Sequence, residues 1–289
     1  MLNQKIISSQ TKILGIIGHP ISHSMSPIMH NIALNDLNLD YVYIAFDVIP
    51  KNLKNALKGM KALNIHGLNI TIPHKESVIP YLDKVDSLAQ KIGAVNTLKL
   101  TNDRLFGKNT DAAGFKQALN DAEINPSGLD VLIIGSGGAA KAVSYSLIES
   151  VNRLTIFNRT KQNADQLVNT LKKDSKSQII AKKLNEFNLA NEIKNIDLLI
   201  NATPVGMYPS HHESVVSPDM FHKDMTVFDL IYNPLETQLI KDAKIAGCKT
   251  LNGLDMLINQ GALAFEWWTK KKPNTNLMKR KIIEILSEK

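Results

Sequence analysis

The sequence predicts an α/β protein with two domains, and three observations favour this fold class. Apolar, β-branched segments alternate with segments of helical periodicity along most of the chain, an order typical of parallel sheets covered by helices. The apolar segment 131–134 runs directly into a glycine-rich turn at residues 135–140, as in doubly wound dinucleotide-binding folds. A length of 289 residues is also more than one domain usually needs.

The clearest break in the chain is the Asn-Pro-Ser-Gly sequence at residues 125–128, a combination that ends helices and forms loops. We therefore expect a domain boundary close to it, with a first domain at residues 1–115 and a second at residues 116–252. The segment 253–289 has helical periodicity and no strand pattern. We expect its helices to return to the first domain and complete it.

In the first domain, short β-branched and aromatic segments indicate strands. The expected strands are 12–17, 41–46, 68–72 and the two arms of a hairpin, 95–100 and 104–106. Ser26 followed by Pro27 predicts a helix start with the serine as N-cap, and Ile28, Ile32 and Leu37 mark its apolar face. Further helices are expected around residues 53–63, 83–92 and 111–122. This order favours a mostly parallel sheet.

In the second domain, apolar segments indicate strands that alternate with helical segments. The expected strands are 131–134, 154–157, 179–181, 197–201 and 227–231. Helices are expected directly after the glycine-rich turn, at 163–171 and 237–245, and near the C-terminus at 253–268 and 276–286. Strands that alternate with helices after a glycine-rich first turn favour a Rossmann-like fold.

The composition excludes several classes of function. The net charge of +7 comes almost entirely from scattered lysines without interleaved aromatic residues, so we expect no nucleic-acid partner. No apolar segment has the length of a membrane span, and we expect neither membrane association nor a signal peptide. The single cysteine, Cys248, excludes an internal disulfide and indicates a reducing, cytoplasmic setting.

His211 and His212 lack a third ligand at a metal-site spacing, so no metal is expected. The oligomeric state stays open, a homodimer included.

The glycine-rich turn predicts a dinucleotide site. Gly135 permits the tight turn, Gly137 lets the backbone approach a pyrophosphate, and Ala140 is small enough for the helix to pack on the strand. The N–H groups at the start of the helix would bind the phosphates. Where NAD sites carry an acidic residue, after the second strand, this chain has Arg159, whose guanidinium suits the 2′-phosphate of NADP. The alternatives are an ordinary strand-to-helix turn and a solvated arginine.

Polar stretches follow the strands expected in the first domain, at residues 23–27, 69–75, 93–97 and 109–111. Together they offer hydroxyls, amides, one lysine and one carboxylate. This set suits a polyhydroxylated small acid, and Lys75 with Asp111 can move a proton. Each residue also has a structural alternative: Lys75 as a surface lysine, and His19, His23 and His74 as local hydrogen-bonding residues.

Nine short motifs, in this order along the chain, resemble those of the shikimate dehydrogenase family. The motifs of the first half are Ser-Met-Ser-Pro at 24–27, Asn-Ile-Thr-Ile-Pro-His-Lys at 69–75, Gly-Ala-Val-Asn-Thr at 93–97 and Asn-Thr-Asp-Ala-Ala-Gly at 109–114. Those of the second half are Gly-Ser-Gly-Gly-Ala-Ala at 135–140, Asn-Arg-Thr at 158–160, Asn-Ala-Thr-Pro-Val-Gly-Met at 201–207, Tyr-Asn-Pro-Leu-Glu-Thr at 232–237 and Gly-Leu-Asp-Met-Leu-Ile-Asn-Gln at 253–260. The resemblance spans nearly the whole chain.

The resemblance implies an enzyme that reversibly reduces 3-dehydroshikimate to shikimate with NADPH, in the biosynthesis of aromatic amino acids. It implies an N-terminal substrate-binding, catalytic domain and a Rossmann-like NADP-binding domain. Lys75 and Asp111 would be the paired catalytic residues and would also contact the substrate. The other substrate-binding residues implied are Ser24, Ser26, Thr71, Asn96, Tyr232 and Gln260. The cofactor-binding residues implied are Gly135, Ser136, Gly137, Gly138, Ala139, Asn158, Arg159, Thr160, Lys161, Thr203, Leu230 and Gly253.

Two positions depart from the family pattern. Pro204 stands where many members carry serine. Many members also have a second basic residue further along the Asn-Arg-Thr segment, whereas here Lys161 comes directly after Thr160 and the next two residues, Gln162 and Asn163, are uncharged. Discrimination against NAD would then depend mainly on Arg159.

Two alternatives for the function stay open: a quinate/shikimate dehydrogenase with broader substrate and cofactor use, and a non-catalytic NADP-binding regulator. A regulator would need neither Lys75 nor Asp111.

Overall fold

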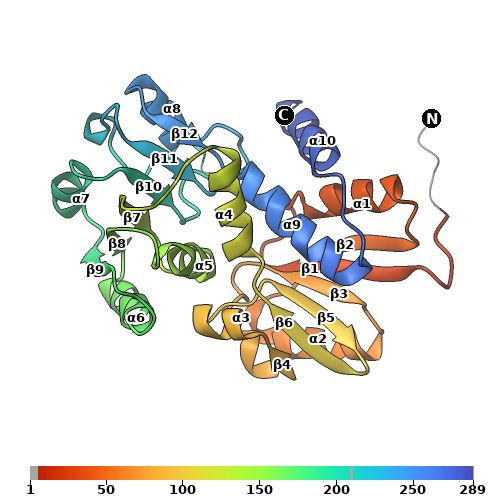
Figure 1. Cartoon of the computed structure of the whole chain (residues 1–289). Coiled ribbons are helices and arrows are strands. Elements are labelled where there is room, and N and C mark those ends of the chain that lie inside the picture. Colours follow the sequence, from red (N-terminus) through yellow and green to blue (C-terminus); the bar gives the residue numbers. More distant parts are fainter. Residues whose placement is uncertain (1–5, 209–210, 289) are drawn as a thin grey trace. The chain divides into compact units, whose positions relative to one another are not determined.

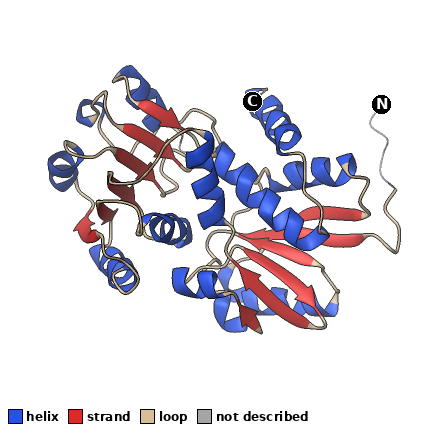
Figure 2. Ribbon diagram, in the orientation of Figure 1, coloured by secondary structure: helices blue, strands red, loops and turns tan. Residues whose placement is uncertain are grey.

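The structure is a computed structural model that describes residues 6–208 and 211–288. The chain divides into two compact units (Figures 1 and 2). Unit 1 comprises Met1–Asp111 and Ile258–Lys289, so the end of the chain completes the unit formed by its beginning. Unit 2 comprises Ala112–Leu257. Each unit is built on one six-stranded sheet.

The sheet of unit 1 has the strand order β2-β1-β3-β5-β6-β4. Its strands are β1 (Lys12–Gly18), β2 (Tyr41–Asp47), β3 (Gly67–Ile70), β4 (Lys84–Val85), β5 (Thr97–Thr101) and β6 (Arg104–Lys108). β1 pairs in parallel with β2 and β3, and β4 with β6, whereas β5 runs antiparallel to both its neighbours. Asn102 and Asp103, both with positive φ, form the turn of the expected hairpin. The prediction of a parallel-rich sheet is confirmed.

The helices of unit 1 come from both ends of the chain. They are α1 (Ser26–Asp36), α2 (Leu53–Ala62), α3 (Ser87–Ile92), most of α9 (Leu254–Thr269) and α10 (Thr275–Ser287), with 3-10 helices at Pro50–Asn52 and Ile79–Tyr81. Trp268 anchors α9 to the sheet, because its buried indole N–H donates to the carbonyl oxygen of Leu98 at 2.8 Å. Its ring lies where a Cβ on Gly67 would be. Only glycine fits at that point of β3.

The start of α1 differs from the sequence expectation. Ser26 is not the N-cap, because its own backbone is already helical and Met25 occupies the cap position. The hydroxyl oxygen that accepts an N–H there is that of Ser24, 3.3 Å from the nitrogen of Ser26. The buried face of the helix includes Met29 and Ala33, whereas the three isoleucine and leucine residues expected there are only partly buried.

Segment 83–92 is not a single helix, contrary to expectation. It contains β4 and then α3, whose N-cap is Asp86. The carboxylate of Asp86 accepts the N–H of Ala89 at 2.7 Å from an extended backbone (φ −67°, ψ 157°), as an N-cap requires. β3 also ends two residues earlier than expected, because Thr71 begins a turn in which its carbonyl oxygen accepts the N–H of His74.

Unit 2 is a fully parallel sheet with the order β12-β11-β10-β7-β8-β9, which is the Rossmann strand order. Its strands are β7 (Asp130–Ile134), β8 (Arg153–Asn158), β9 (Gln178–Lys183), β10 (Leu198–Asn201), β11 (Thr226–Asp229) and β12 (Lys249–Leu251). Its helices are α4 (Asp111–Asp121), α5 (Gly138–Leu147), α6 (Lys161–Leu171), α7 (Glu186–Ile193) and α8 (Gln238–Ile245), with a 3-10 helix at Pro218–Met220. The Rossmann-like prediction is confirmed, although α7 and β12 were not expected.

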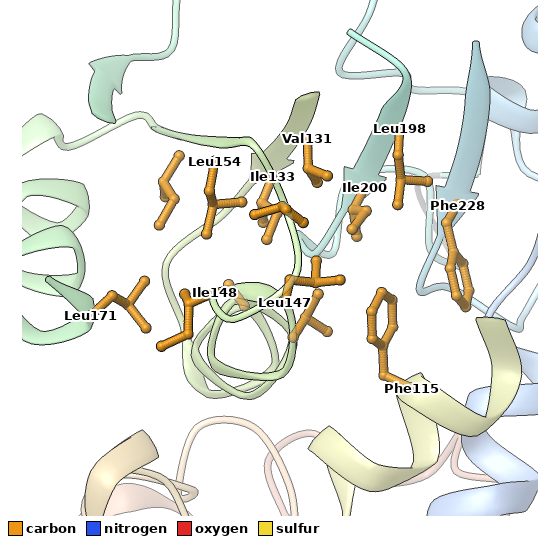
Figure 3. Close-up of a cluster of buried hydrophobic side chains, with 14 of the residues drawn as sticks. Phe115, Val131, Ile133, Leu147, Ile148, Leu154, Leu171, Leu198, Ile200 and Phe228 are labelled. Atoms are coloured by element: carbon orange, nitrogen blue, oxygen red, sulfur yellow. The ribbon is translucent and has the colours of Figure 1, made fainter. Parts of the chain in front are cut away.

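Both faces of the sheet of unit 2 are buried. Val131 and Ile133 of β7 belong to a cluster that includes Leu147 of α5 (Figure 3), whereas Leu132 and Ile134 belong to the cluster that includes residues of α7 and α8. Because side chains alternate between the faces of a strand, a strand buried on both faces is apolar at every position. This explains the continuous apolar run before the glycine-rich turn.

Across residues 6–208 and 211–288, no helix is both long enough and apolar enough to cross a membrane.

Candidate active site

Three segments of unit 1 meet at the carboxyl end of β3. Asn69 of β3 is paired with Thr97 of β5, and Thr97 is paired with the last residue of β6. Because β5 is antiparallel to both neighbours, the residue before β5 and the residues after β6 lie beside the loop that follows β3. The topology therefore brings Lys75, Asn96 and Asp111 together from three separate parts of the sequence.

Lys75 and Asp111 form an ion pair with little access to solvent. The Nζ atom of Lys75 lies 2.7 Å from Oδ2 of Asp111, and 14% and 5% of the two side chains are exposed. The backbone of Lys75 is held in place because its carbonyl oxygen accepts the N–H of Val95 at 2.7 Å. Asp111 is the first residue of α4, where the helix dipole favours a carboxylate. A pair of this kind can donate a proton to a carbonyl oxygen or take one from a hydroxyl.

Asn96 connects this ion pair to two other segments. Its Nδ2 donates to Oδ1 of Asp111 at 2.8 Å, to Oγ1 of Thr110 at 2.9 Å and to Oε1 of Gln260 at 3.2 Å. Its Oδ1 accepts the N–H of Thr110 at 2.8 Å. Gln260 lies on α9, so the C-terminal segment contributes an amide to the site. Four predicted site residues, Lys75, Asn96, Asp111 and Gln260, thus form one hydrogen-bonded network.

Ser24, Ser26 and Thr71 have no hydrogen bond to this network within the described part of the chain. The hydroxyl of Ser24 accepts the N–H of Ser26, and the N–H of Thr71 donates to the carbonyl oxygen of Ile17 at 2.9 Å. Ser24 and Thr71 are half-buried, and Ser26 is buried. Ser24 and Thr71 therefore keep part of their surface exposed.

The histidines near these motifs have local contacts. The Nδ1 of His19 lies 2.7 Å from Oδ1 of Asp47 at the surface. The buried ring of His74 contacts the carbonyl oxygen of Val48 through Nε2. These contacts correspond to the structural alternative for both residues.

The glycine-rich turn of unit 2 has a shape that fits a pyrophosphate. Gly135 has a φ of +119°, and a Cβ there would lie 2.9 Å from the carbonyl oxygen of Ala202, so only glycine is tolerated. Gly137 is the N-cap of α5, with an ordinary φ of −78°. A Cβ on Gly137 would meet no atom of the protein within 4 Å. The backbone itself does not require this second glycine, and its lack of a side chain keeps open the space at the start of α5.

The basic residues after β8 differ in their contacts. Lys161 forms an ion pair with Asp165, with its Nζ 2.6 Å from Oδ1. Arg159 is exposed, and its guanidinium has no hydrogen bond or ion pair to any residue that the structure describes. Asn158 closes the turn, because its Nδ2 donates to the carbonyl oxygen of Thr160 at 2.9 Å. An anion at this point of unit 2 would find Arg159 unengaged and Lys161 already paired.

A buried carboxylate joins the loops that follow β10 and β11. Asp229 accepts hydrogen bonds from Nδ2 of Asn201 at 3.0 Å, from the N–H of Ile231 at 3.1 Å and from the hydroxyl of Thr237 at 2.6 Å. The Oδ1 of Asn201 in turn accepts the hydroxyl of Thr203 at 2.7 Å. Burial raises the pKa of Asp229 to about 6, although its three donors lower it. These hydrogen bonds connect the loop that contains Thr203 with the loop that contains Leu230 and Tyr232.

Two further predicted residues of unit 2 approach each other closely. A Cβ on Gly253 would collide with the carbonyl oxygen of Leu230, and the N–H of Gly253 donates to the carbonyl oxygen of Ile231 at 2.9 Å. Gly253 is thus required for the segment before α9 to pass along the end of β11.

No group of three or more His, Cys, Asp or Glu side chains within the described ranges is arranged to hold a metal ion.

Three family models match successive parts of the chain. The shikimate dehydrogenase substrate binding domain matches residues 16–98, the shikimate / quinate 5-dehydrogenase domain residues 117–238, and the shikimate 5′-dehydrogenase C-terminal domain residues 253–283. The shikimate dehydrogenase (NADP(+)) of Methanocaldococcus jannaschii is 46% identical over 293 residues, which cover 98% of this chain and 100% of that protein. The chain belongs to the shikimate dehydrogenase family.

Solved structures of shikimate dehydrogenases share the fold of the whole chain. One, in complex with NADP+, is 45% identical with a TM-score of 0.90 and covers 97% of this chain and 98% of its own. Another, from Listeria monocytogenes in complex with shikimate and NAD, is 37% identical with a TM-score of 0.86 and covers 96% and 98%. The resemblance inferred from the nine motifs is confirmed.

Sequence reasoning from the shikimate dehydrogenase motifs did not single out three members of the network in unit 1. They are Asn69, Thr97 and Thr110, which hydrogen-bond to one another or to Asn96. All three lie inside the motifs at 69–75, 93–97 and 109–114, so a signal was present. The motifs do not indicate which of their polar residues face each other.

Proposed function

We propose that this chain catalyses the reversible, NADPH-dependent reduction of 3-dehydroshikimate to shikimate. The observation that carries the proposal is the shielded ion pair of Lys75 and Asp111, held by Asn96 at the end of β3. The relative in Methanocaldococcus jannaschii carries the name shikimate dehydrogenase (NADP(+)). A protein that only bound a dinucleotide would gain nothing from a desolvated charge pair in its other unit, because burying charges costs free energy.

Unit 2 is the proposed cofactor unit. The open space at Gly137 and the uncapped N–H groups at the start of α5 fit a pyrophosphate, and the unengaged Arg159 fits a 2′-phosphate. Thr203, Leu230 and Gly253 lie in the loops at the carboxyl ends of β10, β11 and β12 respectively, the edge at which Rossmann folds bind their ligands. When bound, NADPH supplies the hydride.

Lys75 is the proposed proton donor in the direction of reduction. Negative charge grows on the carbonyl oxygen as the carbonyl carbon is reduced, so a nearby ammonium group lowers the barrier in two ways: it stabilises the charge and provides the proton. A lysine side chain is ordinarily protonated at neutral pH. Asp111 holds the ammonium group through the 2.7 Å contact. In the direction of oxidation, the deprotonated pair takes up the proton of the hydroxyl.

The remaining polar residues are proposed to hold the substrate. The hydroxyls of Ser24 and Thr71 suit a carboxylate and a hydroxyl group respectively, and the amides of Asn96 and Gln260 suit hydroxyl groups. Ser26 and Tyr232 complete the proposed set. We also propose a cytoplasmic location, which the unpaired Cys248 supports.

The proposal is tested by incubating the purified protein with shikimate or quinate and with NADP+ or NAD+, and by following the absorbance of the reduced cofactor. We expect the highest kcat/KM for shikimate with NADP+. Comparable values for quinate and for NAD+ would instead identify a broad quinate/shikimate dehydrogenase. No turnover with any pair, in a protein that still binds NADP+, would identify a regulator and overturn the proposal.

A further inference from the structure

A chain of hydrogen bonds leads from the middle of β2 to the proposed catalytic pair. The hydroxyl of Tyr43, a buried residue of β2, donates to Oδ1 of Asn69 at 2.7 Å. The Nδ2 of Asn69 donates to the carbonyl oxygen of Asn96 at 3.1 Å and to Oγ1 of Thr97 at 3.2 Å. The side chain of Asn96 then contacts Asp111. Sequence reasoning treated Tyr43 only as a strand residue.

The orientation of the Asn69 amide is determined by a backbone group. A carbonyl oxygen accepts but cannot donate, so the atom of Asn69 that faces the carbonyl oxygen of Asn96 must be Nδ2. The other end, Oδ1, then faces the hydroxyl of Tyr43. Tyr43 must therefore be the donor in this contact. Phenylalanine at this position would leave that oxygen without this donor.

The orientation of the Asn96 amide is determined in the same way. The N–H of Thr110 donates but cannot accept, so the atom 2.8 Å from it must be Oδ1 of Asn96. Thr97, which accepts from Asn69, donates its own proton to the same Oδ1 at 3.1 Å. The Nδ2 of Asn96 is left to face Oδ1 of Asp111. Each donor in the chain thus points toward Asp111.

Tyr43 is held rigidly enough to direct this chain. The side chain of Asn31 forms two hydrogen bonds with the backbone of Tyr43: Nδ2 donates to the carbonyl oxygen at 2.8 Å, and Oδ1 accepts the N–H at 2.9 Å. The ring of His30 stacks on the ring of Tyr43 with centroids 4.3 Å apart and an angle of 13° between the planes. Burial lowers the pKa of His30 to about 3, so the stacked ring is neutral near neutral pH. The ring of Tyr43 is thus buried and packed against His30, on a backbone held by Asn31.

We propose that Tyr43 is a positioning residue for the proposed reaction. Its hydroxyl fixes Asn69, Asn69 fixes Thr97 and the backbone of Asn96, and Asn96 holds Asp111 in the geometry in which that carboxylate orients Lys75. This inference rests on the proposed function, because it assigns Tyr43 a role in the same proton transfer.

The test replaces Tyr43 with phenylalanine, which keeps the ring and the stacking and removes the hydroxyl. We expect kcat for shikimate oxidation to fall about tenfold, the effect of one lost hydrogen bond to a buried acceptor, with KM for NADP+ unchanged. The KM for shikimate should change less than kcat, because Tyr43 acts on the chemical step through Asn96 and Asp111 and does not touch the substrate. Tyr41→Phe, on the same strand, is the matched control and should leave kcat and the two KM values unchanged.

A double-mutant cycle separates positioning from general packing. If Tyr43 acts through Asn69, the Tyr43→Phe substitution should have almost no effect on kcat in an Asn69→Ala background. Thr97→Val removes the hydroxyl that follows Asn69 in the chain of hydrogen bonds. If Tyr43→Phe does not fold, Thr97→Val is combined with Asn69→Ala in its place. An unchanged kcat in folded Tyr43→Phe, or in Thr97→Val where that variant replaces it, would overturn the inference, as would full additivity in the cycle. Failure of the proposed function can be told apart from failure of the inference about Tyr43, because in the first case even the unsubstituted protein would not oxidise shikimate.

Discussion

The ammonium nitrogen of Lys75 lies 2.7 Å from one carboxylate oxygen of Asp111, and the other oxygen accepts a hydrogen bond from Asn96 at 2.8 Å. Both oxygens of Asp111 therefore face donors, a geometry that suits an ionised carboxylate beside an ammonium group. In the proposed reduction, Lys75 is the member of the pair with a proton to give. Asp111 orients that proton.

The two glycines of the turn before α5 should respond differently to alanine. Gly135→Ala should lower the free energy of unfolding by about 1–3 kcal/mol, because the backbone there has a φ of +119° and the carbonyl oxygen of Ala202 is too close. Gly137→Ala should fold normally, because its φ is ordinary and its Cβ has space, but should weaken NADP+ binding. Urea unfolding and a cofactor titration measure the two effects. Unchanged NADP+ binding in Gly137→Ala would contradict the proposed pyrophosphate site.

Arg159→Ala should reduce the preference for NADP+ over NAD+. The exposed guanidinium has no partner within the described residues, so its removal should change the free energy of unfolding little. A bound 2′-phosphate would lose one bidentate contact. We expect kcat/KM for NADP+ to fall about tenfold or more, with little change for NAD+. Lys161→Ala is the matched control, with a smaller effect because Lys161 is paired with Asp165. Equal losses with both cofactors would show that Arg159 does not recognise the phosphate.

Asp229 should make the stability of the protein depend on pH. Burial raises its pKa from 3.8 to about 6, so the folded state binds this proton more tightly than the unfolded state. The stabilisation is present at low pH and is lost as the pH rises through about 6. Relative to Asp229→Asn, the free energy of unfolding should fall by about 3 kcal/mol as the pH increases from below 4 to about 7. Urea unfolding of both proteins across this range tests it, and a pH-independent difference would contradict it.

Much of the fold follows from patterns in the sequence. The strand 131–134 and its turn were predictable because a strand buried on both faces is apolar throughout and because Gly135 needs a positive φ. The helix start at Ser26 was mispredicted because serine and proline also occur within a first turn, one residue after the cap. Strand β12 was missed because its three residues carry too little alternation to form a pattern.

The site was predictable to a smaller extent. The motifs bring Lys75, Asn96 and Asp111 to strand ends, but their pairing depends on β5 being antiparallel to β3 and β6, a long-range property that no local pattern contains. Tyr43 looked like any aromatic residue of a strand. Its contact with Asn69 becomes visible only when β2, β1 and β3 are placed side by side.

The role of Lys75 in proton transfer is tested most directly by the rate of hydride transfer in a single turnover. This rate is measured with shikimate and NADP+ in the unsubstituted protein and in Lys75→Ala. We expect NADPH to form with the unsubstituted protein. In Lys75→Ala the rate should be lower by about 100-fold or more, with both ligands still bound, because the loss of an acid–base group affects the chemical step. A Lys75→Ala variant with an unchanged rate, or an unsubstituted protein that forms no NADPH, would contradict the account.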